Sequence, residues 1–441
     1  MNTLMTYFKQ LKDLISRNSF LKSIGLLSGG VIVSHLIVFI TSPILSRIFT
    51  PESFGRFAVF STFLNTTVIL AGLRYEYAVV IPERKEEAES LLVISLIFSG
   101  FSTLIFSILY YLFVRFDVLK YGELETWSTV AFFFIFLFSS ITNCLRYWFI
   151  RVENFKIISV FNIYQNIWRS FAQVLLGFLG FGWVGLLLSE VVGRFFGIRE
   201  LLSSVKNTTL IFHALPEKRE INRVFLKYQK FAIFGLPSAF INTFSTVVPV
   251  LFISSLFGVA QAGQFALVQR MFGIPIVLIS SSFSDVFYSK MTKLVKLNSL
   301  DAQNFFWSIA KILFLIASTI SVALFFTIEY VVELIFGAKW KIAGEMAKVL
   351  VPWVFSQIAV SPLSTVIFIF SGQQAKLIFD VTLLALTVFS FVLASAQSLN
   401  ALESLQIFSF LMLFCYGLYF FILLQLIKNN VNQGVKISKD N

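Results

Sequence analysis

Apolar residues fill the chain in long continuous runs, and short polar stretches separate one run from the next. The hydrocarbon core of a bilayer is about 30 Å thick, and an α-helix needs about 20 apolar residues to cross it. The runs are continuously apolar and do not alternate with a period of two, so they predict helices and not the strands of a barrel. We therefore predict an all-α polytopic membrane protein with twelve transmembrane helices, over residues 20–46, 54–80, 89–114, 127–150, 157–180, 182–203, 231–257, 261–288, 304–328, 345–371, 376–397 and 402–427.

The composition supports a membrane protein and suggests its orientation. Of the 441 residues, 57% are hydrophobic and only 13% are charged, which excludes an ordinary soluble domain. Most of the 35 lysines and arginines fall in the two terminal segments and in the loops after even-numbered predicted helices. Positive residues beside transmembrane helices are retained on the cytoplasmic side, so both termini are predicted to be cytoplasmic. The formal net charge of +12 then reflects topology, and no nucleic-acid partner is expected.

The N-terminal residues 1–18 are predicted to form a cytoplasmic amphipathic segment. Apolar residues recur there every three or four positions, opposite basic residues, which is typical of a helix lying on an anionic membrane surface. A frayed polar tail is the alternative interpretation. The apolar set is Leu4, Phe8, Leu11 and Ile15, and the basic set is Lys9, Lys12 and Arg17.

An internal repeat divides the chain into two halves. The connector SRIFTPESFGRFAVF (46–60) returns as SSLFGVAQAGQFALV (254–268), and one constant offset aligns Ser46 with Ser254 and Gly55 with Gly263. Each connector joins the first and second helix of a six-helix half, so both halves enter the membrane in the same direction as a parallel repeat. We predict two pseudo-symmetric six-helix lobes around a central cavity, suited to alternating access. The predicted boundaries are 19–203 for the N-terminal lobe, 204–230 for a cytoplasmic linker, 231–427 for the C-terminal lobe and 428–441 for a cytoplasmic tail.

Catalytic and metal-binding patterns are not found in the sequence. Cys144 and Cys415 lie in or near predicted helices and form neither a disulfide framework nor a metal-ligand spacing. His35 and His213 are too far apart, in sequence and predicted depth, to form a ligand pair. No nucleophile elbow, phosphate loop or zinc motif is present. The protein is therefore expected not to be an enzyme and to need no cofactor or metal.

Six stretches of the sequence together resemble a known family. They are RIFTPESFGRFA, GLRYEYAVVIPERKEEAESLL, GLPSAFINTF, FGVAQAGQFALVQRMFGIP, VFYSK and FGAKWKIAGEMAKVLVPWVFSQIAVSPLS. The chain resembles the prokaryotic polysaccharide transporter family, the O-antigen and exopolysaccharide flippases of the multidrug/oligosaccharidyl-lipid/polysaccharide exporter superfamily. The resemblance implies that the chain moves an undecaprenyl-pyrophosphate-linked oligosaccharide from the inner to the outer leaflet of a bacterial cytoplasmic membrane. It implies membrane lipids and other polysaccharide assembly proteins as further partners.

Three arginines are candidate substrate-binding residues. Arg270 and Arg169 lie about midway along predicted helices, where a guanidinium is costly and can hold phosphate oxygens in a bidentate way. Arg74 lies near the cytoplasmic end of its helix, at the depth of a pyrophosphate in the inner leaflet. The alternatives are structural arginines that tie helices together and, for Arg74, a side chain that snorkels to the interface.

Glu190 and His35 are candidates for ion coupling. A carboxylate inside a membrane helix can exchange protons, and a histidine titrates near neutral pH. Glu190 and Arg194 are also four residues apart on one predicted helix, which is the spacing of a simple ion pair. For His35 the alternative is a packed, hydrogen-bonded side chain.

Two other functions remain as alternatives to the flippase. A multidrug or cation-coupled exporter of the same superfamily would require acidic residues deep in its cavity, whereas the clearest mid-helix charges here are Arg169 and Arg270. A membrane glycan polymerase or ligase would require a large external loop with catalytic groups. The longest external segments, near 115–126 and 329–344, are short.

Overall fold

The computed structural model describes residues 19–207, 217–297, 299–370 and 373–437, and within them the chain is helical with no strand. The predicted all-α class is therefore confirmed for these residues. The predicted amphipathic segment 1–18 and parts of the predicted linker and tail lie outside the described residues. The helices are α2 (Ser19–Ile48), α3 (Pro51–Val68), α4 (Tyr75–Ala78), α5 (Lys85–Arg115), α6 (Ser128–Arg151), α7 (Phe155–Phe178), α8 (Gly182–Asn207), α9 (Lys218–Lys227), α10 (Leu236–Phe257), α11 (Val259–Leu297), α12 (Ser299–Phe336), α13 (Lys341–Val349), α14 (Val351–Val360), α15 (Val366–Ile369), α16 (Gln373–Ala396) and α17 (Ala401–Ile437), with the short turns η1 (Val118–Leu124), η2 (Phe231–Gly235), η3 (Ala338–Trp340) and η4 (Ser361–Thr365).

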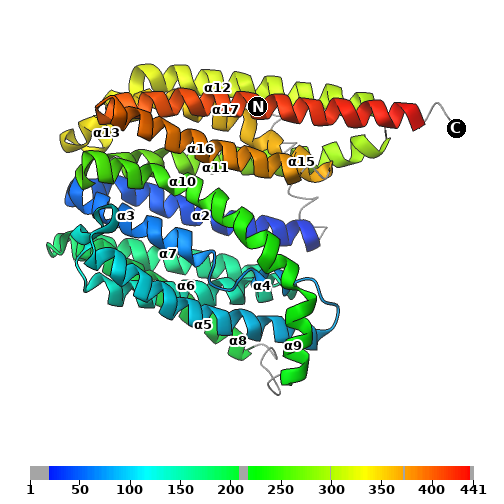
Figure 1. Ribbon diagram of the computed structural model, residues 1–441, viewed down its shortest axis with the longest axis horizontal. Coiled ribbons are helices and arrows are strands. Elements are labelled where there is room, and N and C mark those ends of the chain that lie inside the picture. Colours follow the sequence, from blue (N-terminus) through cyan, green and yellow to red (C-terminus); the bar gives the residue numbers. More distant parts are fainter. Residues whose placement is uncertain (1–18, 208–216, 298, 371–372, 438–441) are drawn as a thin grey trace, which may run out of the picture. The chain divides into compact units, whose positions relative to one another are not determined.

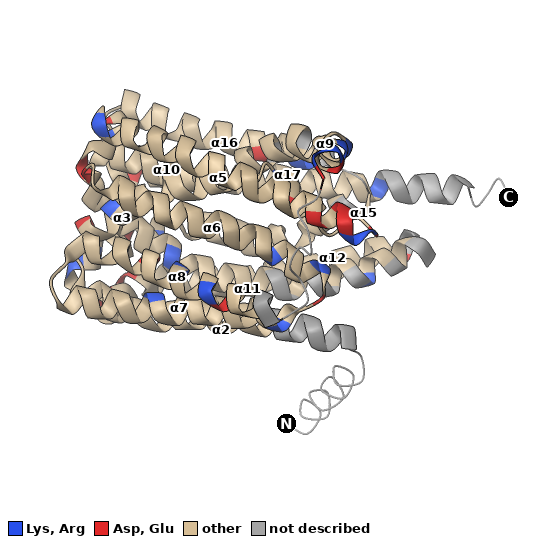
Figure 2. Ribbon diagram, turned by 90° about the horizontal axis from the view of Figure 1, so that it is seen from below, with Lys and Arg blue, Asp and Glu red and all other residues tan. Residues whose placement is uncertain are grey.

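Many of these helices are long and apolar enough to cross a membrane. Within the described ranges, eight helices meet that condition, and a ninth is added if a bent pair is one span. Figure 2 shows long uncharged stretches along the helices, with charged residues concentrated towards their ends. Helices α3, α7 and α8, which cover three of the predicted spans, are not among the eight. The protein is therefore a multi-pass membrane protein, and the total of twelve spans remains a prediction.

The chain divides into two compact units, each a set of long helices lying side by side (Figure 1). The first contains residues 1–49 and 63–240, and the second contains residues 50–62 and 241–441. In the first unit, α7 packs along both α2 and α8, and α5 packs along α6. In the second, α12 packs along α14 and α16 packs along α17. The predicted lobe boundaries are not tested by this division and stay predictions.

Two of the predicted spans are not single continuous helices. The run 54–80 ends its first helix at Val68 and resumes only at Tyr75, because Leu73 and Arg74 adopt left-handed conformations with φ of 49° and 66°. The run 345–371 is bent by 53° between residues 338–349 and 351–365. Prolines at the starts of α14 and η4 lack the N–H that would continue the preceding helix. Hydropathy alone detects neither break, since both segments stay apolar.

A close backbone contact in the second unit joins the two repeated connectors. A Cβ atom placed on Gly55 would lie 1.8 Å from the carbonyl oxygen of Val259, and one placed on Gly263 would lie 1.7 Å from that of Pro51. Only glycine allows the two helix starts to approach so closely. Beside this contact, the Phe54 ring meets the edge of the buried Trp340 ring with centroids 5.1 Å apart.

Candidate functional site

The clearest group of charges inside the first unit lies where α7 and α8 cross. The helices approach closely there because position 193 on α8 is glycine. A Cβ atom at Gly193 would lie 2.7 Å from the Arg169 Cβ and 2.9 Å from the backbone oxygen of Gln165. This contact fixes the base of the Arg169 side chain against α8, so its guanidinium reaches the polar residues on that helix.

Arg169, Glu190 and Arg194 form one ion-paired group, called here the arginine cluster. The Nη1 atom of Arg169 lies 3.0 Å from Oε1 of Glu190, and Nε of Arg194 lies 3.3 Å from Oε2 of the same carboxylate. Arg169 also donates to the side-chain oxygen of Asn166. The predicted pairing of Glu190 with Arg194 is therefore present, and the sequence did not indicate that Arg169 also binds this carboxylate.

The arginine cluster carries an excess of positive charge. Two guanidinium groups share one carboxylate, and the Glu190 side chain is 7% exposed while each arginine side chain is 21% exposed. His35 on α2 interacts electrostatically with Arg169, so a third sequence-predicted residue belongs to the same surroundings. Charges of this kind act more strongly in apolar surroundings than in water. The arrangement suits an anion that can approach the partly exposed arginines.

The carboxylate of Glu190 is held from both sides by guanidinium groups. Its two oxygens lie 3.0 Å from Nη1 of Arg169 and 3.3 Å from Nε of Arg194. With two guanidinium groups on one carboxylate, the cluster has the geometry of a fixed cationic site. Coupling of Glu190 or His35 to an ion stays a prediction.

Arg74 lies in the break between α3 and α4. Its guanidinium carbon lies 4.3 Å from the centroid of the Tyr77 ring, and Tyr77 in turn packs against Tyr147 of α6 with ring centroids 4.3 Å apart. Within the described part of the chain, Nε of Arg74 is buried and has no hydrogen-bond partner. Arginine over an aromatic face keeps its donors available for a further ligand.

Arg270 lies on α11 in the second unit, half-buried and five residues before Pro275. Arg169 and Arg74 both belong to the first unit. Within the first unit, the structure brings Arg169 together with Glu190 and His35. Arg74 forms a separate site at the break after α3.

A buried acid in the first turn of α5 was not predicted from the sequence. Glu87 accepts hydrogen bonds from Nη2 of Arg223 at 2.9 Å and from Nζ of Lys227 at 2.8 Å, both on α9. The hydrogen bond to Glu87 raises the pKa of Lys227. This contact, called here the α9 clamp, holds α9 against α5.

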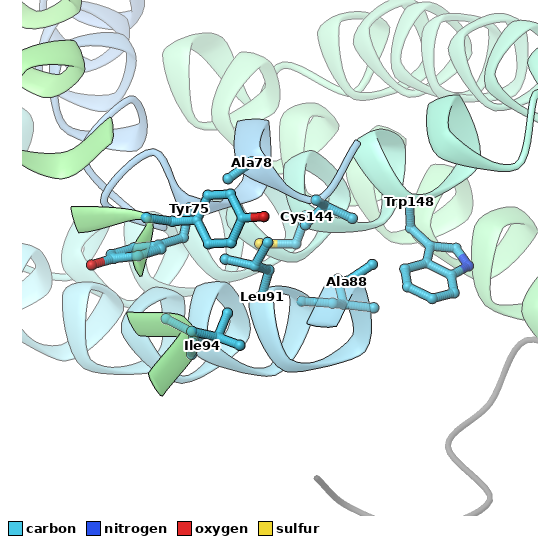
Figure 3. Close-up of a cluster of buried hydrophobic side chains, with 11 residues drawn as sticks. Tyr75, Ala78, Ala88, Leu91, Ile94, Cys144 and Trp148 are labelled. Carbon is cyan, nitrogen blue, oxygen red and sulfur yellow. The ribbon is translucent and has the colours of Figure 1, made fainter. Parts of the chain in front are cut away.

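An apolar cluster packs beside the α9 clamp. Figure 3 shows Tyr75 and Ala78 of α4 beside Leu91 of α5 and Cys144 of α6. The Tyr75 hydroxyl donates to the backbone oxygen of Phe225 at 3.1 Å, which links α4 to α9. The cluster therefore fixes α4 and the break before it against three neighbouring helices.

The second unit has its own buried acid. Asp380 on α16 is 4% exposed, forms an ion pair with Lys376 one turn earlier, and accepts a hydrogen bond from Asn242 of α10 at 3.1 Å. The i,i+4 spacing of Lys376 and Asp380 was visible in the sequence, whereas the contact with α10 depends on tertiary packing.

No metal site is found among the described residues, where no three His, Cys, Asp or Glu side chains form a group that could hold an ion. Cys144 and Cys415 are both buried free thiols.

The chain is similar to known proteins of polysaccharide biosynthesis. A family model described as polysaccharide biosynthesis protein matches residues 44–345. The succinoglycan biosynthesis transport protein ExoT of Rhizobium meliloti (strain 1021) is 24% identical over 252 residues, which are 57% of this chain and 49% of ExoT. The match thus spans about half the length of that relative.

Solved structures with the same fold are transporters. An inward-facing multidrug resistance MATE family transporter of the MOP superfamily matches with a TM-score of 0.70 at 15% identity, covering 92% of this chain and 95% of that one. The lipid II flippase MurJ in an inward closed conformation matches with a TM-score of 0.66 at 14% identity, covering 94% and 93%. A MOP superfamily transporter from Pyrococcus furiosus matches with a TM-score of 0.62 at 14% identity, covering 93% and 96%. At these identities the likeness establishes the fold alone.

Proposed function

The chain belongs to the polysaccharide biosynthesis protein family, and from this premise we propose that it is a flippase for a lipid-linked oligosaccharide. The substrate we propose is an undecaprenyl-pyrophosphate-linked O-antigen or exopolysaccharide repeat unit. It moves from the inner to the outer leaflet of the bacterial cytoplasmic membrane by alternating access between two six-helix lobes.

The observation that carries this proposal is the positive excess of the arginine cluster. Two arginines share a single carboxylate on helices α7 and α8, in a protein whose charged residues are otherwise scarce. A pyrophosphate cannot enter apolar surroundings without compensating charge, because an unpaired charge there costs several kcal/mol. Arginine offers two parallel donors that fit phosphate oxygens. The cluster therefore supplies what an anionic headgroup needs on its path.

Arg74 is the proposed entry residue, and Arg270 is a further proposed substrate-binding residue. Arg74 has a buried donor without a hydrogen-bond partner in the described residues, so it is suited to receive the pyrophosphate from the inner leaflet. Arg270, on α11, is the corresponding cation of the second unit. Both roles follow from the proposed function.

The proposal also sets the location of the protein. We propose that both termini are cytoplasmic, as the distribution of lysine and arginine indicates. The further partners are membrane lipids and other proteins of polysaccharide assembly.

Transport in reconstituted vesicles tests the proposal. The purified protein should move a fluorescent undecaprenyl-pyrophosphate-linked oligosaccharide between leaflets, and Arg270→Ala should abolish this while the protein remains inserted. Arg270→Lys should recover only part of the rate, because lysine keeps the charge and loses the planar pair of donors. Lys311→Ala, on α12 and exposed, serves as the control for loss of one positive charge.

Two outcomes would contradict the proposal. Normal flipping by a stably inserted Arg270→Ala protein would show that transport does not need Arg270. Transport of organic cations without movement of the lipid-linked oligosaccharide would instead indicate a multidrug or cation-coupled exporter of the same superfamily.

A further inference from the structure

The break between α3 and α4 creates an irregular stretch of backbone within the first unit. Residues 69–74 form turns, and the hydroxyl of Ser102 on α5 donates to the carbonyl oxygen of Ala71 at 3.0 Å. Irregular backbone in a membrane protein is tolerated where protein or a hydrated cavity satisfies its polar groups. Broken helices of this kind are common at the ion and substrate sites of transporters.

Glu76 lies just after this break and is buried, with 5% of its surface exposed. Across the residues that the structure describes, its Oε2 atom has no hydrogen-bond partner and its carboxylate takes part in no ion pair. A Cβ atom at Gly72 would lie 2.4 Å from Oε2, so the glycine leaves the space that the carboxyl group fills. The acid is therefore enclosed by the fold and not directed into solvent.

The groups around Glu76 offer little compensation for a negative charge. From α6, the Cys144 thiol and the Tyr147 hydroxyl interact electrostatically with it, and both are neutral. From α5, the side chain of Ser95 lies beside Gly72. The turn η2 (Phe231–Gly235), which packs against α4, has no titratable side chain.

The nearby cations do not bind the carboxylate directly. Backbone N–H groups of Arg74 and Glu76 and the charge of Arg74 favour ionised Glu76. The Arg74 guanidinium, however, lies over the Tyr77 ring and forms no ion pair with Glu76. The two cations of the α9 clamp, Arg223 and Lys227, are bound to Glu87.

Three other buried acids show how this fold stabilises a carboxylate that stays charged. Glu87 has a lysine nitrogen at 2.8 Å, Glu190 has an arginine nitrogen at 3.0 Å, and Asp380 is paired with the lysine one turn before it. Each lies in direct contact with a cation. Glu76 is as buried as these three acids and lacks such a contact with a cation.

We propose that Glu76 is a proton-binding site, and that its protonation and deprotonation accompany movement of the break between α3 and α4 during transport. A buried carboxyl group without a cation partner is stable when neutral, and exposing it to water or to a cation releases the proton. A single acid is suited to a proton and not to a metal cation, which requires several oxygen ligands. The link to transport rests on the proposed function, whereas proton binding by Glu76 does not.

Labelling with dicyclohexylcarbodiimide tests proton binding directly. The reagent reacts with protonated carboxyl groups in apolar surroundings: the carboxyl O–H adds across one C=N bond, and the adduct rearranges to a stable N-acylurea that mass spectrometry detects on the peptide. We expect labelling of Glu76 in the full-length protein in vesicles, with no labelling of the ion-paired Glu190 and Asp380. Above the midpoint the protonated fraction falls about tenfold for each pH unit, so labelling should decrease markedly from neutral to alkaline pH.

Two labelling results would overturn the inference. Absence of labelling at Glu76 at every pH would mean that the carboxylate is ionised. Labelling that does not change with pH would mean that the proton is held permanently and takes no part in a cycle. Neither result depends on whether the protein is a flippase.

A pH gradient across the vesicle membrane tests the link to transport. The wild-type flipping rate should change when a gradient is imposed, and Glu76→Gln, which imitates the protonated acid in shape, should remain inserted and lose that response. Glu83→Gln is the matched control, since Glu83 is exposed and the variant should keep the response. A Glu76→Gln protein that responds like the wild type would overturn the link. Absence of flipping by the wild type would contradict the proposed function and leave the labelling result to decide proton binding.

Discussion

Gly55 and Gly263 make reciprocal contacts in the structure. The space that a side chain on Gly55 would need is occupied by the carbonyl of Val259, and the space beside Gly263 is occupied by the carbonyl of Pro51. The offset that aligns Gly55 with Gly263 also aligns Pro51 with Val259. The two copies of the connector therefore contact each other through their backbones. Glycine is required at both positions because the two helix starts approach closely, and not because the backbone has a positive φ.

Substituting either glycine should destabilise the folded protein. Gly55→Ala or Gly263→Ala places a methyl group within 2 Å of a backbone oxygen, so the helices must separate, at a cost of roughly 1–3 kcal/mol by comparison with overpacked cores. Thermal unfolding of the purified protein in detergent measures the change. Gly273→Ala on α11, where an added Cβ meets nothing within 4 Å, is the control and should be neutral or slightly stabilising. Equal melting temperatures for all three variants would contradict the packing argument.

Removing the shared carboxylate of the arginine cluster should be costly. Glu190→Ala leaves Arg169 and Arg194 without their anion in a buried site, and breaking a buried pair in this way typically costs roughly 3–5 kcal/mol. Glu52→Ala removes an exposed partner of Arg56 and should have little effect. Melting temperatures of the two variants, measured side by side, compare the sites. A Glu190→Ala protein as stable as Glu52→Ala would show that the buried pair contributes little.

The α9 clamp should fail when Glu87 loses its charge. Glu87→Gln removes the anion that holds Arg223 and Lys227, so trypsin should cleave α9 faster than in the wild type. Glu86→Gln changes the exposed neighbouring residue and should leave the cleavage rate unchanged. If the two variants are cleaved equally fast, the clamp does not hold α9.

The same clamp should weaken at alkaline pH. The pKa of Lys227 is raised above its ordinary value of 10.5 by the hydrogen bond to Glu87. The stabilisation is fully present below the ordinary value and is lost as pH rises through the raised value. In Glu87→Gln this loss of stability at alkaline pH, followed by the melting temperature of the purified protein, should be smaller than in the wild type, because the partner that raises the pKa is gone.

The orientation is decided by labelling single cysteines in intact cells. Lys218 on α9 and Lys339 in η3 are both exposed, and the native cysteines 144 and 415 are buried. An impermeant thiol reagent should label Lys339→Cys and leave Lys218→Cys unlabelled until the cells are opened, since the basic loops are predicted to be cytoplasmic. The reverse pattern would invert the topology and the direction of transport.

Much of the candidate site was predictable because it depends on local spacing and on the cost of charge in apolar segments. Arg169 and Arg270 can be recognised in the sequence as cations inside long apolar runs. Glu190 and Arg194 can be recognised as a pair four residues apart on one helix. The contact of Arg169 with Glu190 could not be derived in this way, because the residues lie on separate helices whose register is set at Gly193. The burial of Glu76 was missed for the same reason.

The sequence by itself determined that the chain is a helical membrane protein, that one connector recurs in its second half, and that it resembles polysaccharide flippases. Apolar runs, basic loops and a repeated connector are properties of neighbouring residues, and they do not depend on which helices pack together. Only the tertiary structure decided which buried acids meet cations from other helices. Glu87 pairs with Arg223 and Lys227 of α9, and Glu190 pairs with Arg169 of α7, whereas Glu76 is enclosed beside the break at residues 73–74 without such a partner. These contacts depend on helix packing and backbone conformation, which no local pattern encodes.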